Sequence, residues 1–237
     1  GVLGEISRTH EEINAIEQGR FARLSVGSIS VGVTHLVPQS ILRLQSEHPE
    51  VVVHTAEGPF NSMLDALERR ELDVVVGPLD ARAFGGRLRQ QVLFEDKISA
   101  VCGRHHPLRR RRNPAFAALT QYPWVMPPHA TLMRSRLDAA LLEHGGADIV
   151  PRVETGSLFT LQTLLATTNH IGICAESVSR HMASLKLLHV IPFAADMPFA
   201  PIGAVWREGR DDAMTRLFVG ALREVVKDQA GRSIGKT

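Results

Sequence analysis

Apolar residues near the start of the chain first follow the period of a strand and then that of a helix. Leu24, Val26 and Ser28 alternate as in a strand with one buried side. The small residues that follow open into a helix with Pro38 in its first turn. A strand that enters a helix in this way leaves backbone N–H groups unpaired at the helix start, where the dipole also favours negative charge. The sequence therefore predicts a place that can hold a small anion.

Two more strands and a helix complete a predicted β-α-β-α-β series. Residues 51–55 form the next strand, which Gly58-Pro59 turns. Asn61 and Ser62 are predicted to cap the helix after that turn. The continuous apolar run 72–77 is typical of a parallel sheet that is covered on both faces.

A second series of strands and helices is predicted over residues 124–191. Its strands are expected at 124–126, 152–155 and 171–174. Thr131 and Ser157 stand at the starts of its helices. A connector over 192–201 then leads to a final strand and to a helix capped at Asp211.

The two series indicate two α/β units joined by two crossings, near residues 97 and 199. The first crossing is marked by Glu95-Asp96-Lys97, three charges that interrupt apolar runs where a core strand would exclude them. Two crossings let such units hinge about a cleft. Ligands of open α/β sheets bind at the carboxyl ends of strands, so the helix starts are the candidate walls of that cleft.

Composition narrows the class of protein to a soluble, cytoplasmic one. Apolar residues at 44% and charged residues at 22% are ordinary for a globular domain, and neither a membrane-length apolar run nor a secretory signal is present. A formal charge of +2 is too small to indicate a nucleic-acid surface, and the basic segment 104–114 is predicted to be a solvated loop. Cys102 and Cys174 lie in apolar runs and are interpreted as reduced core thiols. No metal or cofactor is expected, because no metal-ligand spacing occurs.

An ordered series of short motifs resembles the effector-binding region of LysR-type transcriptional regulators. The first part of the series is Leu24-x-Val26-Gly27, Leu36-Val-Pro38, His48-Pro49-x-Val51, Glu57-Gly58, Leu64-x-x-Leu67 and Glu71-Leu-Asp-Val74. His106-Pro-Leu108 and Gly172-Ile173 match the second subdomain of that family. The resemblance runs from Gly19 to about Val226.

The resemblance implies a type 2 periplasmic-binding-protein-like fold, with two Rossmann-like subdomains joined by two crossover strands and an inducer bound between them. The expected boundaries are 1–21 for the end of a linker helix, 22–96 with 199–228 for subdomain I, 97–198 for subdomain II and 229–237 for a flexible tail. The family's N-terminal winged helix-turn-helix is absent from these residues, so DNA binding is expected only of a longer parent protein. The resemblance further implies a dimer or tetramer and no enzymatic activity.

The effector is expected to be a small organic acid. Ser28 and Ser30 are candidate hydroxyl donors to its carboxylate, and Arg134 is a candidate bidentate partner. The resemblance also implies pocket-lining positions, because family members line their pocket where this sequence has Phe60, Asn61, Thr131 and Met133. The predicted effector-binding residues are Ser28, Ser30, Val31, Phe60, Asn61, Thr131, Met133, Arg134 and Thr155. The serines could instead only cap a helix, the arginine could be merely solvated, and the apolar members could belong to the core.

Two other classes of protein stay open at this point. A solute-binding protein of a transporter would have the same two-unit fold, and a DNA-binding segment upstream would distinguish the regulator from it. A serine hydrolase is the second alternative, because Ser28-Ile-Ser-Val-Gly32 has the spacing of a nucleophile elbow. Its other members would be Asp96 or Asp196 with His189, which have no defining spacing.

Overall fold

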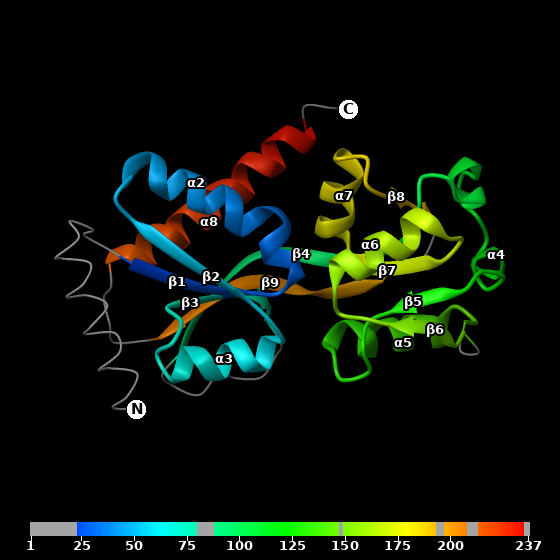
Figure 1. Cartoon of the computed structure of the whole chain (residues 1–237), viewed down its shortest axis with the longest axis horizontal. Helices are drawn as coiled ribbons and strands as arrows, with labels where there is room; N and C mark the ends of the chain where they lie inside the picture. Colours follow the sequence, from blue (N-terminus) through cyan, green and yellow to red (C-terminus); the bar gives the residue numbers. More distant parts are fainter. Residues whose placement is uncertain (1–22, 80–87, 147–148, 193–196, 208–212, 235–237) are drawn as a thin grey trace. The chain divides into compact units, whose positions relative to one another are not determined.

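The computed structural model describes residues 23–79, 88–146, 149–192, 197–207 and 213–234 (Figure 1). The described residues fall into two compact units, which divide between Phe94 and Glu95 and again between Ala200 and Pro201. The first unit contains the residues before the first division and after the second, and the other unit lies between them. The predicted linker helix over 1–21 and the cap at Asp211 lie outside the described residues.

The first unit is a mixed sheet with helices on both faces. Its elements are β1 (Arg23–Ser28), η1 (Gly32–Leu36), α2 (Val37–Glu47), β2 (Val52–Glu57), α3 (Phe60–Glu68), β3 (Val74–Pro78), the first part of β4 (Leu88–Cys102), most of β9 (Pro198–Arg207) and α8 (Ala213–Ile234). The strand order is β2-β1-β3-β9-β4. β1 runs parallel to β2 and β3, and β9 is antiparallel to β3. The predicted β-α-β-α-β series is therefore present.

The core of this unit explains why the third strand is apolar throughout. Val74 and Val76 belong to one buried cluster, with residues of α2 and α8 such as Leu44 and Phe218. Val75, between them, belongs to a second cluster on the opposite face, with Leu67 of α3. Successive side chains of a strand point to opposite faces, so a sheet that is covered twice needs an apolar residue at every position.

The second unit has the same plan. Its elements are the rest of β4, η2 (Pro107–Arg110), α4 (Phe116–Leu119), β5 (Trp124–Met126), α5 (Leu132–Glu143), β6 (Pro151–Glu154), α6 (Leu158–Thr167), β7 (Ile171–Ala175), α7 (Glu176–Ser184), β8 (His189–Val190) and the start of β9. The strands follow the order β4-β7-β5-β6, and β8 pairs with β4. β5 runs parallel to β6 and β7, as the alternating series predicted.

The crossings differ from the prediction in one respect. Glu95, Asp96 and Lys97 do not interrupt a strand, because β4 is continuous through them. Asp96 is buried, and its carboxylate accepts hydrogen bonds from the backbone N–H and the hydroxyl of Ser177, in the first turn of α7. Asp96, which the sequence analysis assigned to the crossing between the units, thus caps the start of α7 from the strand β4.

The first helix also begins earlier than predicted. Helical backbone starts at Ser30 and passes through a π-helical turn, η1, before α2, so Pro38 does not lie in the first turn of the segment. The N–H of Val37 donates to the carbonyl of Gly32, five residues back. Proline cannot donate the next helical hydrogen bond and crowds the carbonyl four residues before it, and a widened turn relieves both problems.

Three further expectations were wrong. The cap of α3 is Pro59 and not Asn61 or Ser62, and no side chain caps the helix start. The segment 104–114 is not wholly loop, because η2 forms within it. The predicted connector is shorter than expected, since β9 begins at Pro198, and α8 continues to Ile234, beyond the predicted start of the tail. No helix in the described ranges combines the length and apolar character needed to cross a membrane.

Candidate functional site

The carboxyl ends of three neighbouring strands meet at one edge of the first unit. Ser28, the last residue of β1, pairs with Glu57 of β2 on one side and with Val76 of β3 on the other. The helical segment after β1 and the helix α3 after β2 therefore start from the same edge of the sheet (Figure 1). This is the position at which the sequence predicted an anion site.

Ser28 itself is directed into the protein. Its side chain is buried, and its hydroxyl lies 2.9 Å from the carbonyl oxygen of Val76 and 3.0 Å from that of Ile29. A hydroxyl has one proton, so these carbonyls share the only hydrogen that it can donate. The role of Ser28 as a donor to an effector stays a prediction, and its contact with Val76 shows a structural role.

Ser30 and Val31 supply the free donors at this edge. The hydrogen bonds of the first turn go from the N–H groups of Gly32 and Val33 to the carbonyl of Ile29. Within the described part of the chain, neither the N–H groups of Ser30 and Val31 nor the Ser30 hydroxyl have a partner. The Ser30 carbonyl is occupied by the hydroxyl of Thr34, at 2.8 Å. The helix start therefore presents donors and no competing side-chain cap.

The start of α3 is uncapped in the same way. Pro59 occupies the cap position with an extended backbone, and no side chain bonds to the first turn. Phe60 lies against Gly77 of β3, where a Cβ atom would come within 2.6 Å of the ring. Asn61 is exposed, and among the described residues its side-chain amide has no partner. Phe60 thus fixes the helix start, and Asn61 adds a polar group beside it.

The predicted residues of the second unit are engaged differently. The hydroxyl of Thr131 caps α5, since it accepts from the N–H of Arg134 at 3.2 Å and donates to the carbonyl of Pro128 at 2.8 Å. The hydroxyl of Thr155 accepts from the N–H of Ser157 at 3.0 Å. Met133 is half-buried in the first turn of α5. The starts of α5 and α6 are thus capped by the side chains of Thr131 and Ser157.

Arg134 is held inside the second unit by three oxygen atoms. Its side chain is only 6% exposed; Nε lies 2.8 Å from Oδ1 of Asp138, and Nη1 lies 2.8 Å from Oε1 of Glu154 and 3.2 Å from the carbonyl of Pro127. Burial opposes the charge, but the two carboxylates outweigh it and raise the pKa of Arg134 above its ordinary value. Nε and Nη1 are thus already engaged within the unit, and the ligand role of Arg134 stays a prediction.

Sequence reasoning missed the partners of Arg134. Asp138 is four residues further along α5, a spacing that brings side chains together and is readable from sequence. Glu154 ends a neighbouring strand and carried no comparable signal. His129 joins the same cluster, with Nε2 at 3.1 Å from Nη2 of Arg134 and 3.2 Å from Oε1 of Glu154.

The hydrolase arrangement is not formed among the described residues, and Asp196, one of its two candidate acids, lies outside them. Asp96 is occupied by Ser177, and His189 lies in β8, paired with Cys102 of β4. Among the described residues no carboxylate or imidazole is a hydrogen-bond partner of Ser30. A search of the same residues finds no cluster of histidine, cysteine and acidic side chains that could hold a metal ion.

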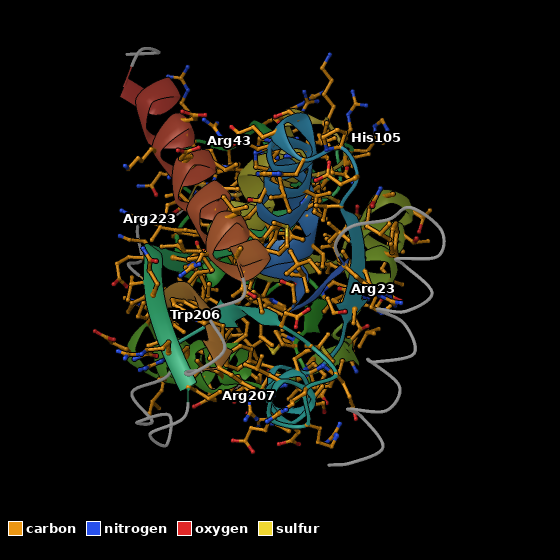
Figure 2. The ribbon with its side chains drawn as sticks, turned by 90° about the vertical axis from the view of Figure 1, so that its left-hand side faces the viewer. Arg23, Arg43, His105, Trp206, Arg207 and Arg223 are labelled. Atoms are coloured by element: carbon orange, nitrogen blue, oxygen red, sulfur yellow. The ribbon has the colours of Figure 1, made fainter. Side chains whose placement is uncertain are left out.

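A cavity of about 260 Å³ lies elsewhere in the first unit, between α2 and α8. It is lined by His35, Gln39, Leu42, Arg43, Val225, Asp228 and Gln229. Arg43 of α2, which is labelled in Figure 2, forms ion pairs with Glu224 and Asp228 of α8, at 2.5 and 3.0 Å. These charged groups already satisfy one another, and none of the predicted effector residues lines this cavity.

Comparison with protein families gives one match that spans most of the chain. The family described as LysR substrate binding domain matches residues 17–227. The chain is 26% identical over 231 residues to the HTH-type transcriptional regulator GalR of Pseudomonas putida, a match that covers 96% of this chain and 57% of GalR. It is 22% identical over 235 residues to the regulator GbpR of Azospirillum brasilense, covering 98% of this chain and 69% of GbpR. The chain therefore spans little more than half the length of the first relative.

Solved structures show the same fold. The CcmR regulatory domain of Synechocystis in complex with 2-PG aligns with a TM-score of 0.71 and 16% identity, covering 87% of this chain and 98% of that domain. The BenM effector binding domain with its effector benzoate aligns with a TM-score of 0.68 and 16% identity, covering 88% of this chain and 94% of that domain. At such low identity the likeness extends to the fold and not to the ligand.

Proposed function

Because the chain belongs to the LysR substrate-binding domain family, we propose that it senses a small carboxylated metabolite for a longer transcriptional regulator. The family is one of regulatory binding domains and not of enzymes. Benzoate, the effector of the structurally similar BenM domain, is itself a carboxylate. That ligand supports the class of effector proposed here, and it does not identify the molecule.

The observation that carries the proposal is the uncapped helix start after β1. The N–H groups of Ser30 and Val31 and the Ser30 hydroxyl have no partner among the described residues, and they stand at the positive end of a helix. A carboxylate accepts several hydrogen bonds at once, and each is stronger than a bond between neutral groups. A neutral ligand would gain less from this set of donors. We therefore assign the effector carboxylate to Ser30 and Val31.

Other predicted residues have supporting roles in this proposal. Asn61 and Phe60 stand at the second uncapped helix start of the same unit, where they would contact the rest of the effector. Thr131, Met133 and Thr155 remain predicted contacts from the second unit. Arg134 holds the start of α5 through its ion pairs with Glu154 and Asp138. Direct contact between Arg134 and the effector stays a prediction.

The parent protein is proposed to be a cytoplasmic regulator that self-associates as a dimer or tetramer and contacts DNA through an N-terminal domain outside these residues. Effector binding would favour one arrangement of the two units over another and so change how subunits pack. Coupling of this kind is typically worth about 1–3 kcal/mol, enough to change promoter occupancy severalfold.

Ligand-induced thermal stabilisation of the 237-residue chain tests the proposal. We would screen benzoate and small aliphatic mono- and dicarboxylates, each beside its uncharged amide. A carboxylate present at about a hundredfold excess over its Kd adds about 2.7 kcal/mol to the free energy of unfolding and raises the melting temperature. The matched amide should give a much smaller rise.

A pair of variants then assigns the carboxylate to its donors. Ser30→Ala removes one charge-assisted hydrogen bond and should weaken the affinity about tenfold. Ser46→Ala, an exposed serine near the end of α2, is the matched control and should bind as the original chain does. Equal affinities for acid and amide would contradict the proposed class of effector. An unchanged affinity in Ser30→Ala would contradict the proposed position.

A further inference from the structure

A concentrated positive surface on the second unit is not explained by effector sensing. Five exposed arginines form it, and we call them the arginine surface: Arg104, Arg109, Arg110, Arg111 and Arg112. His105, which is labelled in Figure 2, is exposed beside the first of them. From Lys97 to Leu137 inclusive, the sequence holds eight lysines and arginines and no aspartate or glutamate. The net charge of the whole chain, +2, conceals this local excess.

The segment that carries the arginines is anchored to the core. His106 is buried; its Nδ1 accepts from the N–H of Leu108 at 3.1 Å, and its Nε2 lies 3.2 Å from the carbonyl of Asn169. The ring of Tyr122 packs against His106 with centroids 4.5 Å apart. Leu108 is 1% exposed, inside the short helix η2. The arginines are therefore displayed on a fixed backbone, in contrast to the solvated loop that sequence predicted.

No acidic group compensates for these charges in the described ranges of the chain. None of the five arginine side chains has an ion pair or a hydrogen bond with a described residue. Consecutive residues are far closer together than the Debye length of about 8 Å at physiological salt, so salt screens their repulsion poorly. Solvated surfaces usually intersperse charges of both signs. An anchored, uncompensated cluster of one sign is better explained by a polyanionic partner.

The chemistry of the surface favours duplex DNA among the polyanions. Protein interfaces depend on large apolar or aromatic anchors, and 104–113 exposes none, since its one large apolar residue, Leu108, is buried. Single-stranded nucleic acids need aromatic platforms for stacking, and the ring of Tyr122 is occupied by His106. Contacts to the phosphate oxygens of a duplex backbone need no aromatic or apolar group, and guanidinium groups are sufficient for them.

We propose that the arginine surface is an auxiliary contact for the phosphate backbone of duplex DNA, independent of sequence. This inference rests on the family's regulatory role for the presence of DNA nearby, but it does not require that the effector site is correctly placed. The contact would position DNA that is already held by the parent protein's own DNA-binding domain, since phosphate contacts set orientation and carry no sequence information.

Fluorescence anisotropy of the 237-residue chain with a duplex of random sequence tests this directly. With a duplex of about 30 base pairs and salt between about 20 and 200 mM, three to four phosphate contacts predict a slope of about −3 in log K against log salt. The variant R109Q/R110Q/R111Q/R112Q should bind about tenfold more weakly or worse at low salt, with a clearly shallower slope. The corresponding lysine variant should retain most of the binding.

The matched control removes the same number of charges elsewhere. R136Q/R152Q/R180Q/R223Q replaces four exposed arginines outside the arginine surface and should bind DNA within about twofold of the original chain. Circular dichroism confirms that each variant is folded. No binding by the original chain at low salt, or equal losses in both glutamine variants, would overturn the proposal.

Competition by poly-glutamate but not by duplex would reassign the surface to an acidic protein. Effector-induced thermal shifts should be the same in all these variants, which separates this test from that of the effector site.

Discussion

The hydroxyl of Ser28 and the backbone of Gly32 are in such close contact that a Cβ atom on Gly32 would lie 1.9 Å from Ser28 Oγ. The contact joins the end of β1 to the first turn of the helix that carries the proposed carboxylate site. Ser28 Oγ is fixed in turn by its 2.9 Å hydrogen bond to the carbonyl of Val76. The position of the free donors on Ser30 and Val31 therefore depends on the glycine that directly follows them in the chain.

We expect Gly32→Ala to destabilise the chain by about 1–3 kcal/mol, because the added methyl group overpacks a buried site. Ser28→Ala should cost about 1 kcal/mol, through the loss of its buried hydrogen bond. The double variant should cost less than the sum of the two, since removing the hydroxyl removes the closest contact of the new methyl group. Urea unfolding of the four proteins measures the coupling. Strict additivity would show that the two residues do not interact as described.

Arg134 is expected to contribute more to stability than to effector affinity. Arg134→Gln should cost about 2 kcal/mol, because it removes the shared cation between Asp138 and Glu154. The two carboxylates are 47% and 38% exposed, so water limits the cost to less than that of a fully buried pair. Asp138→Asn should cost less than 1 kcal/mol, since Glu154 remains. If Arg134→Gln instead abolished effector binding at unchanged stability, direct contact with the ligand would be supported.

The buried histidine of the second unit should make stability depend on pH. Burial lowers the pKa of His106 below its ordinary value of 6.5, although its hydrogen bond to the carbonyl of Asn169 acts in the opposite direction. The unfolded chain then takes up a proton before the folded one does. The contribution of His106 is therefore complete above pH 6.5 and is lost as the pH falls from there through the lowered pKa. His189, whose pKa is lowered by burial and by the charge of Arg109, acts in the same direction.

Urea unfolding at a series of pH values checks this dependence. His106→Gln should be less stable at neutral pH and should lose less stability than the original chain on acidification. His105→Gln, its exposed neighbour, is the control and should leave the profile almost unchanged. A steeper acid loss in His106→Gln would mean that the sign of the His106 contribution is wrong.

The two cysteines should be unreactive in the folded chain and unable to form a disulfide. Burial raises the pKa of both thiols to about 12, so almost no thiolate is present at neutral pH. Cys102 pairs with Ile171, whereas Cys174 pairs with Ser99, three positions before Cys102 in β4. That offset separates the cysteines by about 10 Å along the strands, beyond the reach of a disulfide.

Labelling with a thiol reagent at neutral pH measures this expectation. The native chain should show slow labelling of both cysteines, and the chain in denaturant should show rapid labelling of both. Replacement of each cysteine by alanine, one at a time, assigns the signals. Rapid labelling of Cys174 in the native state would contradict its burial.

Local patterns were sufficient for most of the elements. Strand and helix periods placed β1, β3, β5 and β7 within two residues, and the cap at Ser157 is formed as predicted, with its hydroxyl accepting from the N–H of Thr160. These features depend on neighbours within a few positions, so their signal is contained in short stretches of sequence. The motif series also identified the family that the comparison then gave.

What the tertiary structure alone decided is which polar groups remain available. Ser28 and Ser30 look alike in sequence, but the pairing of β1 with β3 occupies the first with Val76 and leaves the second open. The sequence marked Arg134 as a candidate ligand, whereas the fold brings Glu154, at the end of β6, into an ion pair with it. A hydrogen bond to a partner many residues away leaves no trace in the local pattern. The sequence therefore determined the fold class and the sheet edge at which we propose the site, and long-range packing determined which donors at that edge are free.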